Sequence, residues 1–306
     1  MSIIEQAAKR LEELRRAGID IPENQQPHPA HDRDQNASGA PTTQHAAGPT
    51  AGGNRVATSR VGSASPNYFE LDLVKLAKNG FVTPDSPRSR IADEFRIVKR
   101  PLIANAAGKR STPIKNGNLI MVTSAVPGEG KTFSAINLAM SLAMELDQTV
   151  LLVDADVARP TLPRILGLPS GKGLLDALQS KSVDLSDSLI QTNVEKLTLL
   201  TSGTQNAHAT ELIASDTMVQ LLDAMVARDP ERIVIFDSPP LLVTTESRVL
   251  ATHVGQIVFV VQAETTLQSD VKKALATIDA CPVKMILLNQ ARSVAQGAYG
   301  YGYGYD

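Results

Sequence analysis

The sequence predicts an α/β fold, a mostly parallel sheet flanked by helices on both faces. From residue 119 onward, short apolar segments alternate with helical segments, which is the pattern of a parallel sheet covered by helices. The apolar segments also contain few polar residues, as is typical of strands that are buried on both faces.

The elements follow in order along the chain. Two helices are expected ahead of the sheet, at residues 68–76 and 89–100, with turn residues between them. Six strands are expected, at residues 119–122, 149–153, 197–200, 233–236, 257–261 and 285–288. The helical segments that accompany them are residues 133–146, 211–228, 246–252 and 268–279.

Residues 1–18 predict an amphipathic helix. Ser2 and Glu5 have the spacing of a capping box, and Gly18 ends the segment. One stripe at helical spacing is apolar and consists of Ile3, Ile4, Ala7, Leu11 and Leu14. A helix of this length is marginal alone in water, so the stripe needs a partner, either the chain's own core or another protein.

Residues 19–66 are expected to form a disordered linker. They are rich in Pro, Gly, Ala, Ser, Thr, Gln, Asn and His and contain almost no large apolar side chain. Such a segment buries too little surface to offset the entropy of ordering it. The main domain is therefore expected at residues 67–292, followed by a flexible tail at residues 293–306.

Composition excludes several classes of protein. The 306 residues carry a formal net charge of −2, so nothing in the charge balance calls for nucleic acid. Cys281 is the only cysteine, which rules out an internal disulfide and fits a reducing compartment. No apolar run approaches the ~18 residues of a membrane span, and the N-terminus lacks the layout of a secretion signal. We therefore expect a cytoplasmic protein without a transmembrane span of its own.

Residues 124–132 read Ser-Ala-Val-Pro-Gly-Glu-Gly-Lys-Thr and lie between an expected strand and an expected helix. This context predicts a phosphate-binding loop (P-loop), although Ala125 stands where the strict pattern has its first Gly. Backbone N–H groups of the loop and the helix N-terminus would hold a polyphosphate. Lys131 would reach the β- and γ-phosphates, and the Thr132 hydroxyl would ligate Mg²⁺. The predicted nucleotide-binding residues are Pro127, Gly128, Glu129, Gly130, Lys131, Thr132 and Phe133.

Three carboxylates follow expected strands. Asp154 and Asp156 end one strand and Asp237 ends another, and in parallel sheets ligands lie at these carboxyl ends. MgATP chemistry depends on positioning, charge neutralisation and a metal held by a carboxylate. We therefore expect ATP and Mg²⁺ as cofactors, with Thr132, Asp154 and Asp237 as metal ligands. The expected catalytic residues are Lys131, Asp154, Asp156 and Asp237.

Tyrosine alternates with glycine at the C-terminus. Four of the five tyrosines in the chain lie there: Tyr299, Tyr301, Tyr303 and Tyr305. Such a segment is either a low-complexity tail, a strand that caps the sheet edge, or a string of phosphoacceptors for a neighbouring active site. The P-loop in the same chain favours the phosphoacceptor interpretation, and the fold class becomes that of a P-loop NTPase.

In combination these motifs resemble the bacterial tyrosine kinases, the family of capsular and exopolysaccharide tyrosine autokinases. Residues 1–18 and 82–96 resemble the branch associated with exosortase-type exopolysaccharide systems. The resemblance implies that Asp154 and Asp156 form the second Walker motif and that Asp237 is the Walker B carboxylate. It further implies that neighbours in a homo-oligomer phosphorylate the tail in trans.

The resemblance also implies partners. The family's Glu-x-x-Arg-x-x-Arg oligomerisation motif is matched only in part, by Asp93, Arg96 and Lys99. Because many members need a membrane activator and this chain has no apparent span, a separate membrane partner of the polysaccharide chain-length type is implied. The chain would then act in the cytoplasm, peripheral at the inner membrane.

Two other functions share the same motifs. A partition- or septum-placement-like ATPase would use the fold as a nucleotide-driven switch, but those proteins carry a signature Lys where Val126 stands here and lack a tyrosine tail. A non-kinase nucleotide-binding scaffold of polysaccharide export would bind ATP through the same residues.

Overall fold

The computed structural model describes residues 67–86, 88–108, 113–180, 185–227, 229 and 231–291. The expected N-terminal helix, the linker at residues 19–66 and the tyrosine-rich tail at residues 293–306 lie outside the described residues.

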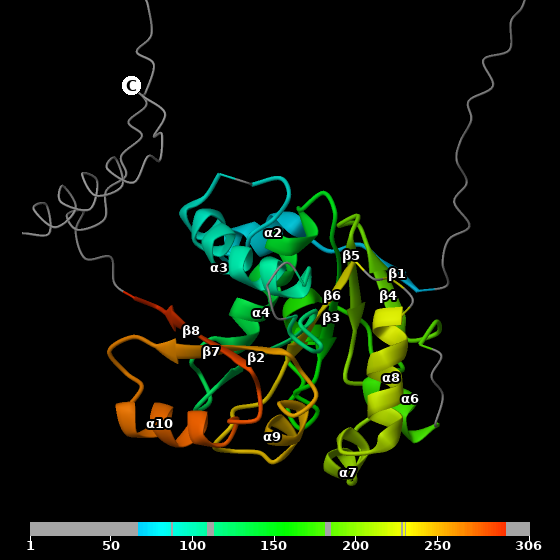
Figure 1. The fold of residues 1–306 in the computed structure, drawn as a ribbon. Coiled ribbons are helices and arrows are strands. Elements are labelled where there is room, and N and C mark those ends of the chain that lie inside the picture. Colours follow the sequence, from blue (N-terminus) through cyan, green and yellow to red (C-terminus); the bar gives the residue numbers. More distant parts are fainter. Residues whose placement is uncertain are drawn as a thin grey trace, which may run out of the picture. The chain divides into compact units, whose positions relative to one another are not determined.

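The described part of the chain folds around one eight-stranded sheet, with strand order β1-β4-β5-β3-β6-β2-β7-β8 (Figure 1). Six strands run parallel to one another: β2 (Leu119–Ser124), β3 (Thr149–Asp154), β5 (Leu197–Leu200), β6 (Arg232–Asp237), β7 (Gln256–Gln262) and β8 (Val283–Asn289). At one edge, β4 (Leu189–Thr192) pairs antiparallel with β5, and β1 (Tyr68–Phe69) pairs parallel with β4. The predicted fold class is confirmed, and all six predicted strands are present.

The sequence prediction is wrong at two helices. Residues 68–76 were expected to be helical throughout, but Tyr68 and Phe69 pair with Gln191 and Thr192 of β4. Helix α2 (Leu73–Lys78) begins only after Asp72, whose side chain caps it by accepting a hydrogen bond from Lys75 N. The segment expected as one helix at 211–228 is two, α7 (Ala209–Ile213) and α8 (Asp216–Ala227).

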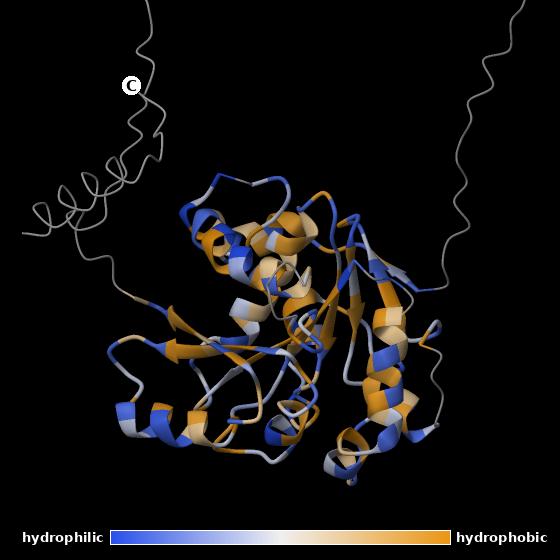
Figure 2. Cartoon of the chain, viewed as in Figure 1, coloured by the Kyte–Doolittle hydropathy of each residue, from blue (hydrophilic) through white to orange (hydrophobic). Residues whose placement is uncertain are grey.

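Helices cover both faces of the sheet. One face carries α2, α3 (Arg90–Ala106), α4 (Lys131–Ala143) and α5 (Leu162–Leu166), whose apolar side chains join one buried cluster. The other face carries α6 (Leu174–Gln179), α7, α8, α9 (Glu246–Leu250) and α10 (Gln268–Ala276), which join a second cluster. Figure 2 shows the apolar strands between these two layers.

Strand β2 explains why the central strands are apolar throughout. Leu119 and Met121 belong to one buried cluster, while Ile120 and Val122 belong to the other. Successive side chains of a strand point to opposite faces, so a strand covered on both sides has no position for an exposed polar residue. The continuous apolar runs in the sequence therefore reflect the two helical layers.

The order β3-β6-β2 at the centre of the sheet brings three loops together. The strands are parallel, so the chain leaves β2, β3 and β6 at the same edge. Residues 124–132, the Asp154–Asp156 turn and Asp237 all lie at that edge as a consequence.

Candidate active site

The P-loop connects β2 to α4 through two glycines in unusual conformations. Gly128 and Gly130 have φ angles of 89° and 90°, which side chains rarely adopt. A Cβ on Gly130 would also lie 2.0 Å from Nδ2 of Asn289. The φ angle of Gly130 favours glycine, and a side chain there would also displace the Asn289 amide.

The N-terminus of α4 lies at this loop, and its first amides precede the helical hydrogen bonds. The first helical hydrogen bond runs from Ser134 N to Gly130 O at 2.9 Å, so the amides of Lys131, Thr132 and Phe133 lie ahead of it. Gly130 is the N-cap and supplies no side-chain hydrogen bond. Free N–H groups and the positive end of the helix dipole together make a site for an anion such as phosphate.

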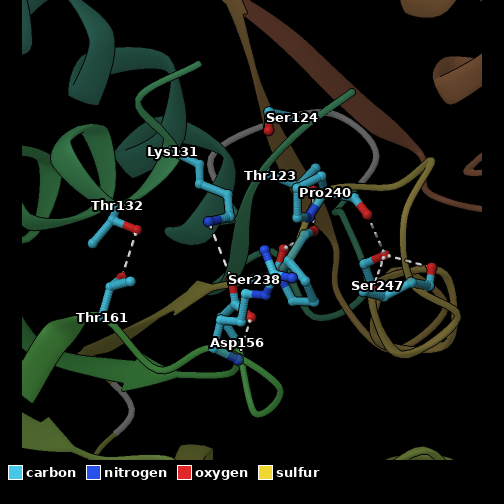
Figure 3. A network of polar contacts seen from close by, with 12 residues as sticks. Thr123, Ser124, Lys131, Thr132, Asp156, Thr161, Ser238, Pro240 and Ser247 are labelled. Atoms are coloured by element: carbon cyan, nitrogen blue, oxygen red, sulfur yellow. Dashed lines mark hydrogen bonds and ion pairs between the residues drawn. The ribbon is translucent and has the colours of Figure 1, made fainter. Parts of the chain in front are cut away.

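Lys131 reaches from the P-loop to the turn that follows β3. Its Nζ lies 3.1 Å from Oδ2 of Asp156, and the two side chains are 14% and 7% exposed. Figure 3 shows this contact as a dashed line, with Thr132 beside Thr161, the N-cap residue of α5. The hydroxyls of Thr132 and Thr161 are 3.1 Å apart and share a hydrogen bond.

Asp154 and Asp237 occupy neighbouring positions in the sheet. They pair in register across β3 and β6, and both are fully buried. Backbone amides satisfy Asp154, because Oδ1 accepts from Asp156 N and Oδ2 accepts from Leu162 N, each at 3.2 Å. Burial, reinforced by the charge of Asp237, raises the pKa of Asp154 to about 8.

Asp237 lacks such support. Within the described part of the chain, neither of its carboxylate oxygens has a hydrogen-bond partner. Burial raises its pKa to about 7, although the charge of Lys131 and the nearby Thr132 hydroxyl oppose that shift. A buried carboxylate whose oxygens lack hydrogen-bond partners is costly and is the kind of group that holds a cation.

The donor set fits Mg²⁺. Among the described residues, no three His, Cys, Asp or Glu side chains form a cluster that would hold a metal by themselves. Mg²⁺ at nucleotide sites needs less, since one or two carboxylates combine with phosphate oxygens and water. Asp237, Asp154 and the Thr132 hydroxyl supply a set of that kind at one edge of the sheet.

The remaining predicted residues lie in four situations. Pro127 and Gly128 form the exposed tip of the P-loop, and the ring of Phe133 packs against Phe81 with centroids 5.0 Å apart. Glu129 is 1% exposed, and its side chain accepts hydrogen bonds from within the domain. The predicted phosphoacceptors Tyr299, Tyr301, Tyr303 and Tyr305 lie outside the described residues.

The structure assigns Lys99, in the partly matched oligomerisation motif, to the interior of the domain. Its side chain is 4% exposed, its Nζ lies 2.7 Å from Oε1 of Glu145, and it donates to the backbone oxygen of Ser141. Burial lowers the pKa of Lys99, while Glu145 opposes that shift. The third position of this motif is therefore already engaged within the subunit.

Sequence reasoning missed the residues that contact the P-loop from other elements. Thr161 contacts Thr132, Thr266 contacts Glu129, and Asn289 contacts both Glu129 and Gly130. Asn289 offered a signal, because it is a polar residue at the end of an apolar strand. Thr266 lies in a turn and Thr161 is the N-cap of α5, and neither offered a signal of its contact.

Comparisons with known proteins extend these observations. The AAA domain family matches residues 117–289, which is more than half of the chain. Tyrosine-protein kinase YwqD of Bacillus subtilis (strain 168) is 30% identical over 218 residues, covering 70% of this chain and 87% of that protein. CapB of Staphylococcus aureus is 30% identical over 224 residues, covering 72% of this chain and 94% of that protein. This chain belongs to the bacterial tyrosine-protein kinase family.

Two solved structures have the same fold. The chimerical protein CapA2B2 superposes with a TM-score of 0.57 at 28% identity, covering 72% of this chain and 92% of that one. The kinase domain of the Escherichia coli tyrosine kinase ETK gives a TM-score of 0.53 at 30% identity, covering 61% of this chain and 73% of that one. The resemblance found in the sequence is confirmed at the level of the tyrosine kinase family, and its exosortase-associated branch stays a prediction.

Proposed function

We propose that this chain is an ATP-dependent protein-tyrosine autokinase that transfers the γ-phosphate of ATP to C-terminal tyrosines of a neighbouring subunit. The observation that carries the proposal is the convergence of Lys131, Thr132, Asp154, Asp156 and Asp237 at one edge of the sheet. Membership of the tyrosine kinase family supports tyrosine as the acceptor.

The site residues have distinct roles in this proposal. The P-loop amides and Lys131 bind the β- and γ-phosphates, and Thr132, Asp154 and Asp237 hold Mg²⁺. Bound Mg²⁺ would neutralise charge on the phosphates. As Lys131 engages phosphate, its contact with Asp156 is released, and the Asp156 carboxylate can accept the phenolic proton of the incoming tyrosine. The tyrosine oxygen then bonds to the γ-phosphorus, the bond to the β–γ bridging oxygen breaks, and ADP leaves.

The proposal extends to partners and location. The chain would form a homo-oligomer in which tails are phosphorylated in trans, and it would regulate exopolysaccharide synthesis or export. A separate membrane protein would activate it and hold it at the cytoplasmic side of the inner membrane. None of the helices that the structure describes is long and apolar enough to cross a bilayer.

Mass spectrometry tests the proposal. The full chain is incubated with MgATP, alone and with the cytoplasmic segment of a candidate activator, and intact masses and tail peptides are measured. We expect successive additions of one phosphate each, mapped to Tyr299, Tyr301, Tyr303 or Tyr305, and no addition in Lys131→Met. Hydrolysis of ATP with unmodified tails would favour a nucleotide-driven switch instead.

A further inference from the structure

Glu129 is a carboxylate within a loop that binds anions, and its burial needs an explanation. A carboxylate beside phosphates would repel them, yet Glu129 is only 1% exposed. Its side chain is held within the domain, because Oε2 accepts a hydrogen bond from Val126 N at 2.8 Å and Oε1 accepts one from the Thr266 hydroxyl. The first of these bonds joins two residues of the P-loop that are three positions apart.

Asn289 holds the backbone of the same residue. Its Nδ2 donates to Glu129 O at 2.9 Å and lies against the Cα of Gly130, where a Cβ would be only 2.0 Å away. The turn after β7 therefore contacts the Glu129 side chain, while the end of β8 contacts its carbonyl. Two elements far away in sequence fix one residue of the P-loop.

The Thr266 hydroxyl is itself fixed. It accepts a hydrogen bond from Gln262 N at 3.1 Å, and Thr266 N donates to Gln262 O at 3.1 Å. A threonine hydroxyl has one proton to donate, and here that proton goes to Glu129. The turn after β7 thus presents a single donor to the P-loop carboxylate in a defined direction.

We propose that Thr266 is a positioning residue for nucleotide binding, which holds Glu129 and thereby keeps the P-loop in its phosphate-binding conformation. The inference rests on the proposed nucleotide site. A hydrogen bond from a neutral donor to a carboxylate is stronger than one between neutral groups. Without this hydrogen bond, the P-loop also populates conformations that do not bind phosphate. The apparent affinity for nucleotide then falls in proportion to the fraction of molecules whose loop can still bind.

The test compares three variants by equilibrium binding of MgATP and MgADP to the full chain. Thr266→Val removes the hydroxyl with little change in shape, and Thr266→Ser keeps it. Thr265→Val is the matched control, because Thr265 is the exposed neighbour. We expect Thr266→Val to weaken both nucleotides by a similar factor of about tenfold, since the P-loop contacts phosphates common to both. The serine variant should return to within about twofold of the wild type, and the control should not change.

A double variant separates this role from a general loss of stability. If Thr266 acts through Glu129, then adding Thr266→Val to Glu129→Gln causes little further loss, because the contact is already weakened. Multiplied losses, wild-type affinity in Thr266→Val, or failure of serine to rescue would each overturn the inference. A wild-type chain that binds neither nucleotide would instead overturn the proposed nucleotide site. Failure of that site is thereby distinguished from failure of the role inferred for Thr266.

Discussion

Asp154 and Asp237 lie side by side at the carboxyl ends of β3 and β6, both fully buried, but only Asp154 is hydrogen-bonded by backbone amides. The difference suggests different tasks. Asp154 is held in place by the turn that follows β3, whereas Asp237 keeps both oxygens available for a cation.

This arrangement predicts an unusual pH dependence of stability. Burial raises the pKa of Asp237 to about 7, far above the value of about 4 in an unfolded chain. The folded state therefore binds this proton more tightly than the unfolded chain does. The stabilisation that protonated Asp237 contributes is full below about pH 4 and is lost as the pH rises to about 7. We expect Asp237→Asn to melt at a higher temperature than the wild type at pH 8, with a much smaller difference at pH 5.

Thermal unfolding across pH 5–8 without nucleotide measures this effect. Asp147→Asn is the matched control, because Asp147 is exposed, and its profile should parallel that of the wild type. A constant difference between Asp237→Asn and the wild type at all pH values would contradict the assignment.

The contact between Lys131 and Asp156 predicts that binding and transfer can be separated. Asp156→Asn removes the charge that competes with phosphate for Lys131, so affinity for MgATP should be unchanged or tighter. Phosphate transfer should slow by about 100-fold, because the carboxylate that accepts the phenolic proton is lost. Equilibrium binding and single-turnover labelling measure the two quantities, and a parallel loss of both would argue against this role.

The conformation of Gly130 predicts that a side chain at this position lowers the stability of the domain. Gly130→Ala places a Cβ at a φ of 90° and displaces Asn289 from Glu129, so we expect a loss of about 1–3 kcal/mol in the free energy of unfolding. Gly171→Ala is the control, since no atom lies within 4 Å of its Cβ position. Urea unfolding compares them, and equal stabilities of the two variants would refute the close contact.

The buried position of Lys99 predicts that replacing it destabilises the fold and does not change the oligomeric state. Lys99→Ala leaves Glu145 paired only with the exposed Arg100 and removes the donor to Ser141 O, so we expect a loss of about 1–3 kcal/mol in the free energy of unfolding. Lys273→Ala, which removes an exposed ion pair, should cost less than about 0.5 kcal/mol. Unchanged unfolding of Lys99→Ala together with a smaller oligomer by light scattering would return Lys99 to the subunit interface.

Much of the fold and site could be predicted because the signals are local. The strands of the central sheet appear as apolar runs, and the P-loop is a contiguous motif between a strand and a helix. Asp154 and Asp237 were predictable from a general rule, because polar residues at the carboxyl ends of neighbouring parallel strands must meet.

The rest depends on contacts between distant residues. β1 is a two-residue strand, and only its pairing with β4 makes it one. Lys99 reads as a surface charge until Glu145 is brought beside it. Thr266 is 137 residues away from Glu129 in sequence and lies in a turn without a recognisable pattern.

The central claim, phosphorylation of tail tyrosines by a neighbouring subunit, is tested most directly by mixing two variants. One chain lacks residues 293–306 but keeps Lys131, and the other carries Lys131→Met with an intact tail. We measure the intact mass of each chain after incubation with MgATP, together with any activator segment that the wild type requires. The account predicts phosphate on the tail of the Lys131→Met chain only when its partner is present. An unmodified Lys131→Met chain under conditions in which the wild type labels itself would contradict transfer in trans.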